Sequence, residues 1–277
     1  MMTTVAQALA QELAQRGVDR IFGLPGGEVL YLLEASRAAG IDFVLTRHEA
    51  AAGFAAAVYG KLRGTAGVAL ATLGPGAANL ALPIANATLD REPLLALTAQ
   101  LPSDYPLTHT HQRLPLQEMY RPVTKLAAVL RPENALATLR QALDLVCMAP
   151  QGAVHLSLAA EAALAEAGDA TGGSELEPGS ATGPVPVPWS AAAGETEIER
   201  ALTRIRRAER PLLLVGLGAP PELAPALNRL VQERGLPTLV TPKVKGIVDE
   251  TTAAFLGVAG GMAADDLILE LLPQADL

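Results

Sequence analysis

The residue best suited to acid–base chemistry is Glu49, which follows Thr46-Arg47-His48 where a predicted strand gives way to a predicted helix. A carboxyl group in an apolar, water-poor pocket can exchange a proton with a reacting group. The neighbouring Ala50-Ala51-Ala52 and Phe54 supply apolar bulk. The simpler interpretation is structural, because a carboxylate in the first turn of a helix interacts favourably with the helix dipole.

Two glycine-rich turns follow predicted strands. Gly23-Leu24-Pro25-Gly26-Gly27 comes after the first strand, and Gly74-Pro75-Gly76 comes after a later one. Glycines allow the backbone to approach a ligand or a partner closely, and a strand–turn–helix can bind phosphate at the helix N-terminus. The second turn fits neither the dinucleotide-binding pattern nor a P-loop. For Asn79, just beyond it, a local hydrogen bond at the helix start is the alternative to a binding role.

His109 and His111 lie two residues apart in the longest loop of the first half. No third ligand of the right type is near, so we predict no metal site. The only cysteine, Cys147, is interpreted as a buried structural thiol in an apolar helical stretch. An intrachain disulfide is impossible with one cysteine, which is compatible with a reducing cytoplasm.

In this order and at this spacing, the Gly23–Gly27 turn, the Thr46–Glu49 segment and the Gly74–Asn79 segment resemble the pyrimidine-binding domain of thiamine-diphosphate enzymes. Among these the chain most resembles acetolactate synthase large subunits, over nearly its whole length. The resemblance implies that Glu49 is catalytic. In similar enzymes this glutamate hydrogen-bonds the aminopyrimidine ring of thiamine diphosphate and promotes the tautomer that removes the thiazolium C2 proton. The implied reaction is decarboxylation and carboligation of 2-keto acids, a transferase step of branched-chain amino acid biosynthesis.

The resemblance also assigns cofactor contacts by position, to Leu24, Pro25, Pro75 and Asn79 besides Glu49. Arg121-Pro122-Val123-Thr124-Lys125 is similar to the family's Arg-Pro-Ile-Thr-Lys. An ungapped alignment back from it places Gln112 on a cofactor-pocket glutamine and His111 on a substrate-facing phenylalanine. A histidine there could bind a keto-acid carboxylate or donate a proton. The alternative is a solvent-exposed loop histidine.

The elements that must position these residues alternate along the chain. Short apolar runs predict strands, and the stretches between them have helical periodicity. An amphipathic helix from Thr3 or Thr4 to about Arg16 comes first. The predicted strands are 20–24, 42–46, 67–73, 94–98, 125–130 and 153–158, and the predicted helices 28–38, 49–62, 77–89 and 132–148. Pro132 is expected at the first helical position. This alternation predicts parallel βαβ units with both sheet faces covered.

Composition changes between Gly168 and Gly194, where Gly, Pro, Ser and Thr dominate. We predict an interdomain linker there. Beyond it, helices are expected at 195–208, 221–234 and 264–272, with strands at 211–215 and 237–240. The fold class is therefore α/β. A parallel-sheet pyrimidine-binding domain covers residues 1–167, a linker 168–194, and an incomplete, Rossmann-like central domain 195–277.

The resemblance implies that part of an enzyme is missing. No Gly-Asp-Gly segment followed about 30 residues on by asparagine is present, and in the family this segment holds Mg²⁺ and the diphosphate. We expect a truncated form, inactive alone, that needs a diphosphate-binding domain not present in this chain. Its expected partner is a second copy, in a homodimer, or a second chain carrying the diphosphate-binding domain. The central domain binds FAD in acetolactate synthases and is an empty spacer in many relatives. The flavin Met-His-Gly segment is not recognisable near Gly257–Met262, which leaves FAD binding open.

Composition bears on the remaining function classes. The net charge of −8 with scattered acids and bases argues against a nucleic-acid surface. No signal peptide is predicted, and the uncharged stretch Thr65–Leu89 is interrupted by Gly and Pro, so we expect no membrane span and a cytoplasmic protein. Two alternatives remain beside the enzyme: a non-catalytic binding or assembly module that keeps the fold, and a nucleotide-binding α/β protein using Gly216–Gly218.

Overall fold

The computed structural model describes residues 2–102, 104–106, 108–168, 194–260 and 265–277. The described residues fall into two compact units, which are taken separately below. The predicted linker lies almost entirely at 169–193, outside the described residues.

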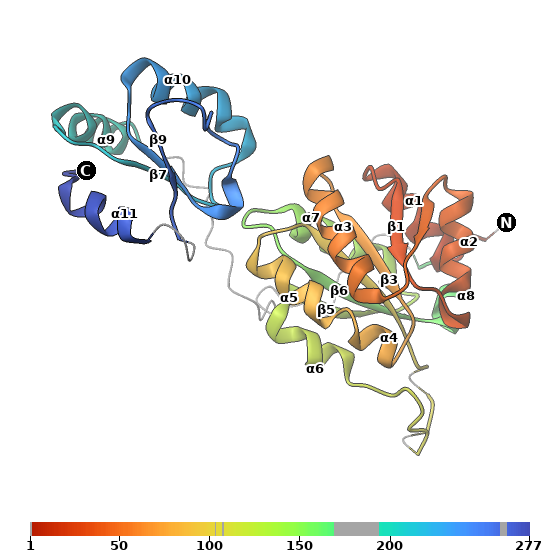
Figure 1. The fold of residues 1–277 in the computed structure, drawn as a ribbon. Coiled ribbons are helices and arrows are strands. Elements are labelled where there is room, and N and C mark those ends of the chain that lie inside the picture. Colours follow the sequence, from red (N-terminus) through yellow and green to blue (C-terminus); the bar gives the residue numbers. More distant parts are fainter. Residues whose placement is uncertain (1, 103, 107, 169–193, 261–264) are drawn as a thin grey trace. The chain divides into compact units, whose positions relative to one another are not determined.

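The first unit is built on a six-stranded, wholly parallel sheet (Figure 1). Its strand order is β2-β1-β3-β4-β6-β5, so the chain crosses over repeatedly. The α/β class and the parallel sheet are confirmed, and each predicted strand exists. The strands are β1 Arg20–Gly23, β2 Asp42–Leu45, β3 Gly67–Ala71, β4 Leu94–Gln100, β5 Leu126–Leu130 and β6 Val154–Ala159.

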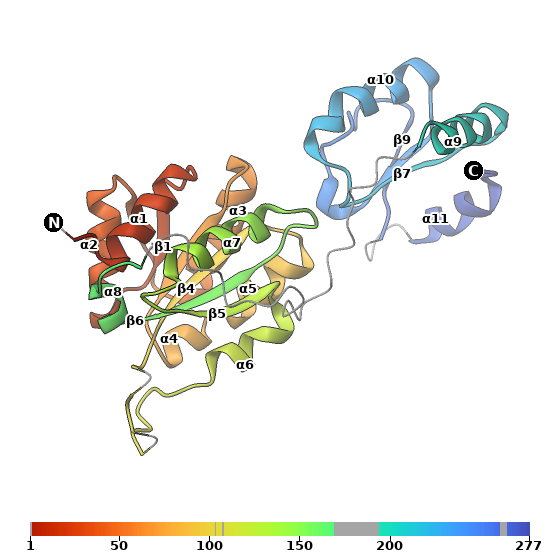
Figure 2. The same cartoon turned by 180° about the vertical axis from the view of Figure 1, so that it is seen from behind.

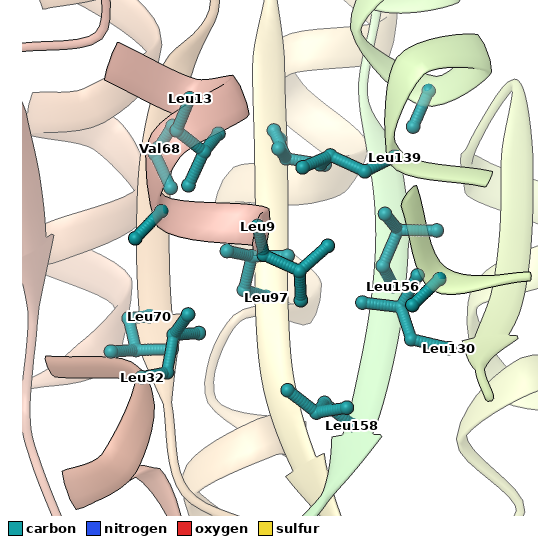
Figure 3. Close-up of a cluster of buried hydrophobic side chains, with 14 of the residues drawn as sticks. Leu9, Leu13, Leu32, Val68, Leu70, Leu97, Leu130, Leu139, Leu156 and Leu158 are labelled. Carbon is teal, nitrogen blue, oxygen red and sulfur yellow. The ribbon is translucent and has the colours of Figure 1, made fainter. Parts of the chain in front are cut away.

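Helices cover both faces of this sheet (Figure 2). One face packs against α1 Val5–Gln15, α2 Leu30–Ala38, α7 Ala135–Cys147 and α8 Ala160–Leu164. Figure 3 shows part of that core, in which Leu9 lies beside the strand residue Leu97. The other face packs against α3 Glu49–Arg63, α4 Pro75–Ala78, α5 Ala81–Leu89 and α6 Leu116–Tyr120. Alanine fills much of this second core, so the helices of that face can lie close to the strands.

The two ends of α1 are determined by local sequence signals. The Thr4 side chain accepts a hydrogen bond from the backbone N–H of Gln7, and the Gln7 side chain bonds back to Thr4, which forms a capping box. The helix is followed by Gly17, whose φ of 83° is in the left-handed region. It therefore begins and ends close to the predicted positions.

Three helix predictions need correction. Helix α7 begins at Ala135 after Asn134, so Pro132 is not its first residue. The stretch predicted as one helix over 77–89 is divided into α4 and α5. The stretch from Glu28 opens as a 3-10 turn, Gly27–Val29, before α2. A further 3-10 turn, Arg121–Val123, follows α6.

Cys147 is exposed, so the prediction of a buried thiol is wrong. The buried positions of α7 include Leu139, Ala142, Leu143 and Val146. Cys147 comes one residue after Val146, off this stripe, and the next position of the stripe lies beyond the helix end.

The second unit holds three parallel strands in the order β7-β8-β9. They are β7 Leu213–Val215, β8 Thr238–Val240 and β9 Phe255–Val258, of which β9 was not predicted. The helices are α9 Glu195–Arg207, α10 Ala224–Arg234 and α11 Asp265–Leu271, with 3-10 turns at Pro221–Leu223, Pro242–Val244 and Leu272–Gln274. A small cluster of valines, including Val215, Val231 and Val240, forms the core.

Across the part of the chain that is described, none of the helices combines the length and the apolar character needed to cross a bilayer. The uncharged stretch Thr65–Leu89 is folded as β3, α4 and α5 in the first unit.

Candidate functional site

Glu49 is the first residue of α3 and lies at the carboxyl edge of the sheet. The preceding His48 caps the helix, because its Nδ1 accepts the backbone N–H of Ala50 at 3.1 Å. Thr46 is tied to the end of β1 through its N–H, which donates to the Gly23 carbonyl at 2.9 Å. These bonds fix the strand-to-helix turn. Glu49 is buried at this turn, and the residue is only 6% exposed.

The two carboxyl oxygens of Glu49 meet different surroundings. Asn79 Nδ2 donates a hydrogen bond to Oε2 at 2.9 Å. Oε1 faces the backbone of Gly76, since a Cβ built there would lie 3.2 Å from Oε1 and 2.7 Å from Thr72 Oγ1. An alanine at position 76 would therefore crowd both polar atoms. The structure brings Glu49, Asn79 and the Gly74–Gly76 turn together.

The two glycine-rich turns adjoin each other through Thr72. A Cβ built at Gly26 would lie 2.3 Å from Thr72 Cγ2, so the backbone of the first turn rests directly on this side chain. Leu24 and Pro25 are in the same turn, half-buried and exposed respectively. Thr72 was missed by sequence reasoning, although its place between a strand and a glycine-rich turn was a usable signal.

Gln112 reaches the second turn from the long loop before α6. Its φ of 56° is in the left-handed region, and a Cβ built at Gly74 would lie 2.6 Å from Gln112 Cβ. Gly74 itself has a φ of 60°. Glycine adopts a positive φ readily, whereas for a glutamine this conformation is uncommon. Their contact places Gln112 beside the turn that carries Pro75, which is exposed.

Arg113 stabilises the long loop before α6 by hydrogen bonds to backbone carbonyls of the same loop. This residue was not identified from the sequence. Its Nε donates to the His109 carbonyl at 2.8 Å, and its Nη2 donates to the carbonyls of Tyr105 and Pro106 at 3.1 Å each. His111 is exposed, and its ring centroid lies 6.5 Å from that of His109. The described contacts join His111 to its own loop and do not join it to Glu49.

Within the described ranges, no group of three or more His, Cys, Asp or Glu side chains could hold a metal ion. A cavity of about 540 Å³ lies in the second unit, lined by residues such as Arg210, Leu236 and Leu256. None of its lining residues belongs to the Glu49 site. This cavity is therefore separate from the site around Glu49.

The glycine turn of the second unit, Gly216–Ala219, closes on itself, because the Ala219 N–H donates to the Gly216 carbonyl at 2.9 Å. The following helical turn begins at Pro221, after Pro220, and Pro225 is near the start of α10. Proline lacks the N–H that binds phosphate at a helix N-terminus. This arrangement weighs against the nucleotide-binding alternative.

Comparison with known proteins finds similar domains in both units. Residues 3–119 match the N-terminal TPP-binding domain of thiamine pyrophosphate enzymes, and residues 198–277 match the central domain of the same enzymes. The chain is 31% identical over 257 residues to the acetolactate synthase isozyme 2 large subunit of Escherichia coli (strain K12), covering 92% of this chain and 45% of that protein. It is 34% identical over 265 residues to the acetolactate synthase large subunit of Parasynechococcus marenigrum (strain WH8102), covering 92% of this chain and 42% of that protein. The chain thus spans less than half the length of these relatives.

Proposed function

Because the chain belongs to the thiamine pyrophosphate enzymes and carries their N-terminal and central domains, we propose that it supplies the pyrimidine-binding half of an active site for 2-keto acids. The enzyme would be of the acetolactate synthase type. The observation that carries the proposal is the buried Glu49 carboxyl, held at one oxygen by Asn79 and open at the other toward Gly76.

The residues present fit the aminopyrimidine half of thiamine diphosphate. A ring nitrogen needs a carboxyl group within hydrogen-bond reach and a flat approach free of side chains. Glu49 offers the carboxyl group. Gly76 offers the approach, since it lacks the Cβ that would crowd Oε1 and Thr72. Leu24, Pro25, Pro75 and Gln112 are proposed to bind around the ring.

In this proposal Glu49 holds and moves one proton. Asn79 fixes Oε2, which leaves Oε1 as the atom that exchanges a proton with the ring nitrogen. Burial excludes water that would otherwise compete for the carboxyl group. When bound, thiamine diphosphate supplies the carbon nucleophile that adds to a 2-keto acid. His111 is proposed to face the substrate.

The diphosphate and Mg²⁺ are proposed to be held by another chain that carries the diphosphate-binding domain. The described part of this chain shows no cluster of metal ligands, and the prolines before α10 remove phosphate-binding N–H groups. Both observations support a divided active site.

The test is Glu49→Gln in this chain, complemented with a diphosphate-binding partner. Glutamine keeps the shape and the hydrogen bond but cannot exchange the proton. Hydrogen–deuterium exchange at C2 of bound thiamine diphosphate should slow by about 100-fold or more. Glu118→Gln is the matched control, because Glu118 is also a first-turn helix glutamate but is exposed. It should exchange at the wild-type rate.

Equal exchange rates for Glu49→Gln and wild type would show that the carboxyl group is structural. The chain would then be better described as a binding or assembly module that keeps the fold.

A further inference from the structure

The glycine-rich turn leads into a kinked pair of helices, and the kink has a chemical cause. Pro83 in α5 has no N–H to donate to the Asn79 carbonyl four residues earlier, and its ring crowds that carbonyl. The helix is therefore interrupted between Ala78 and Ala81. At the interruption the Leu80 N–H donates to the Ala77 carbonyl at 3.0 Å, a tight i to i+3 bond. Asn79 is located at this kink.

A second donor reaches the same carbonyl from a distant part of the chain. The hydroxyl of Tyr120, at the end of α6, donates a hydrogen bond to the Ala77 carbonyl. Tyr120 is completely buried, and burial raises the pKa of its hydroxyl above the ordinary value. The hydroxyl thus keeps its proton at neutral pH and can always donate it.

The ring of Tyr120 packs against His155, a buried polar residue of the sheet. Its centroid lies 4.3 Å from that of His155 in β6. His155 Nε2 is hydrogen-bonded to Thr98 Oγ1 of β4 at 2.9 Å. Both side chains are buried, and burial lowers the pKa of His155 to about 3, so that its ring is neutral. These contacts leave Tyr120 little freedom to move away from Ala77.

We propose that Tyr120 is a positioning residue that fixes the kink at Ala77 and thereby aims the Asn79 amide at Glu49. The contacts run without a break from the sheet to the carboxyl group: Thr98, His155, Tyr120, Ala77, then the kink with Asn79, then Glu49. This role rests on the proposed function, because aiming Asn79 matters for catalysis only if Glu49 exchanges a proton.

The test is Tyr120→Phe in the full chain without cofactor, followed by nuclear magnetic resonance of the Asn79 side-chain amide. The signal is identified by its loss in Asn79→Ser. Its position should shift when Glu49 is replaced by Gln in the otherwise unaltered chain, because the two side chains are hydrogen-bonded. In Tyr120→Phe that shift should fall to less than half its wild-type size. The Leu80 amide should exchange with solvent about tenfold faster.

Ser36→Ala is the matched control. The Ser36 hydroxyl is buried in α2 and donates to the Leu32 carbonyl at 2.7 Å, so the substitution removes a buried hydrogen bond without touching α4 or the residues that support Tyr120. It should leave the Asn79 shift intact. A wild-type shift in Tyr120→Phe, or an equal loss in Ser36→Ala, would overturn the proposal.

A measurement on the unaltered chain covers the case in which Tyr120→Phe fails to fold. The Tyr120 hydroxyl proton should be visible as a slowly exchanging signal close to the Leu80 amide proton. Its absence would contradict the geometry. All these readouts are made without thiamine diphosphate, so they stand apart from the C2 exchange experiment that tests the proposed function.

Discussion

At the scale of single residues, what matters for Glu49 is the charge of its neighbours. Two other glutamates of the first unit are equally buried. Glu12 is bonded to Arg16 at 3.0 Å and to Arg140 at 2.8 Å, and Glu92 lies 4.0 Å from Lys61. Glu49 is instead bonded to the neutral side-chain amide of Asn79. The described contacts therefore distinguish it from the two glutamates that are paired with cations.

His155 should make the stability of the first unit depend on pH. Unfolded, it takes up a proton near its ordinary pKa of about 6.5, whereas in the folded protein burial lowers the pKa to about 3. The unfolded state therefore binds the extra proton between these values, and stability is lost as the pH falls through them. At pH 5 the loss amounts to about 2 kcal/mol.

Urea unfolding at pH 8 and pH 5, followed at the amide protons of β4 and β6, measures this loss. In His155→Leu the difference between the two pH values should shrink by about 2 kcal/mol. His109→Gln is the control, since His109 is exposed, and should leave it unchanged. An unchanged pH dependence in His155→Leu would show that the ring does not resist protonation.

From the sequence, Glu49 and the Gly74–Asn79 segment were each expected directly after a strand of a parallel sheet, and the carboxyl ends of such strands lie at one edge. The sequence could not predict the Asn79 bond to Glu49, which depends on the kink. The positive φ of Gln112 was equally hidden, since glutamine rarely adopts it and only the contact with Gly74 explains it.

At the scale of elements, Lys125 joins the start of β5 to the end of α7. Its Nζ donates to the carbonyls of Leu145, Met148 and Pro150, with distances of 2.8 Å and 3.0 Å for the last two. The last carbonyls of a helix have no partner within the helix. Lys125 supplies one to this end of α7, although it is only 4% exposed and burial lowers its pKa to about 8.

Replacing Lys125 by Met should destabilise the first unit by about 3 kcal/mol, because methionine fills the space but leaves buried carbonyls without donors. The free energy of unfolding checks this, measured in urea at the amide protons of β5 and β6 for Lys125→Met and of β7 and β8 for the comparison variant in the second unit. Lys245→Met is the comparison, since that lysine is 60% exposed and paired with Glu250 at the surface. It should cost under about 1 kcal/mol. Equal small losses would mean that water replaces Nζ at the end of α7.

Strands were easier to predict than helix ends. Each strand of the first sheet is an apolar run bounded by turn residues, and such runs can be recognised locally. β9 was missed because Gly257, with a φ of 135°, interrupts a short segment, and its pairing with β8 is irregular near Thr238 and Leu239. The kink between α4 and α5 required attention to Pro83, whose effect falls on a residue four positions away.

At the scale of the whole molecule, the residues that we propose for catalysis and cofactor binding lie in one unit. Glu49, Asn79 and Gln112 are all in the first unit. In the second unit, the glycine turn considered as a nucleotide-binding site is followed by a helical turn that begins with proline. The family match covers both units. We therefore expect the described residues to bind the aminopyrimidine ring of thiamine diphosphate and not its diphosphate group.

This division predicts how the chain binds thiamine compounds alone. Calorimetric titration should give dissociation constants in the millimolar range for thiamine diphosphate with Mg²⁺, equivalent to about 4 kcal/mol. Thiamine without its diphosphate should bind equally well, because the diphosphate meets no Mg²⁺ site among the residues described. Glu49→Gln should weaken both ligands alike, whereas Glu118→Gln should weaken neither. Adding a chain that carries the diphosphate-binding domain should strengthen the binding of thiamine diphosphate and leave that of thiamine unchanged. Sub-micromolar, Mg²⁺-dependent binding by the isolated chain would contradict the divided site, since it would require a diphosphate anchor within these 277 residues.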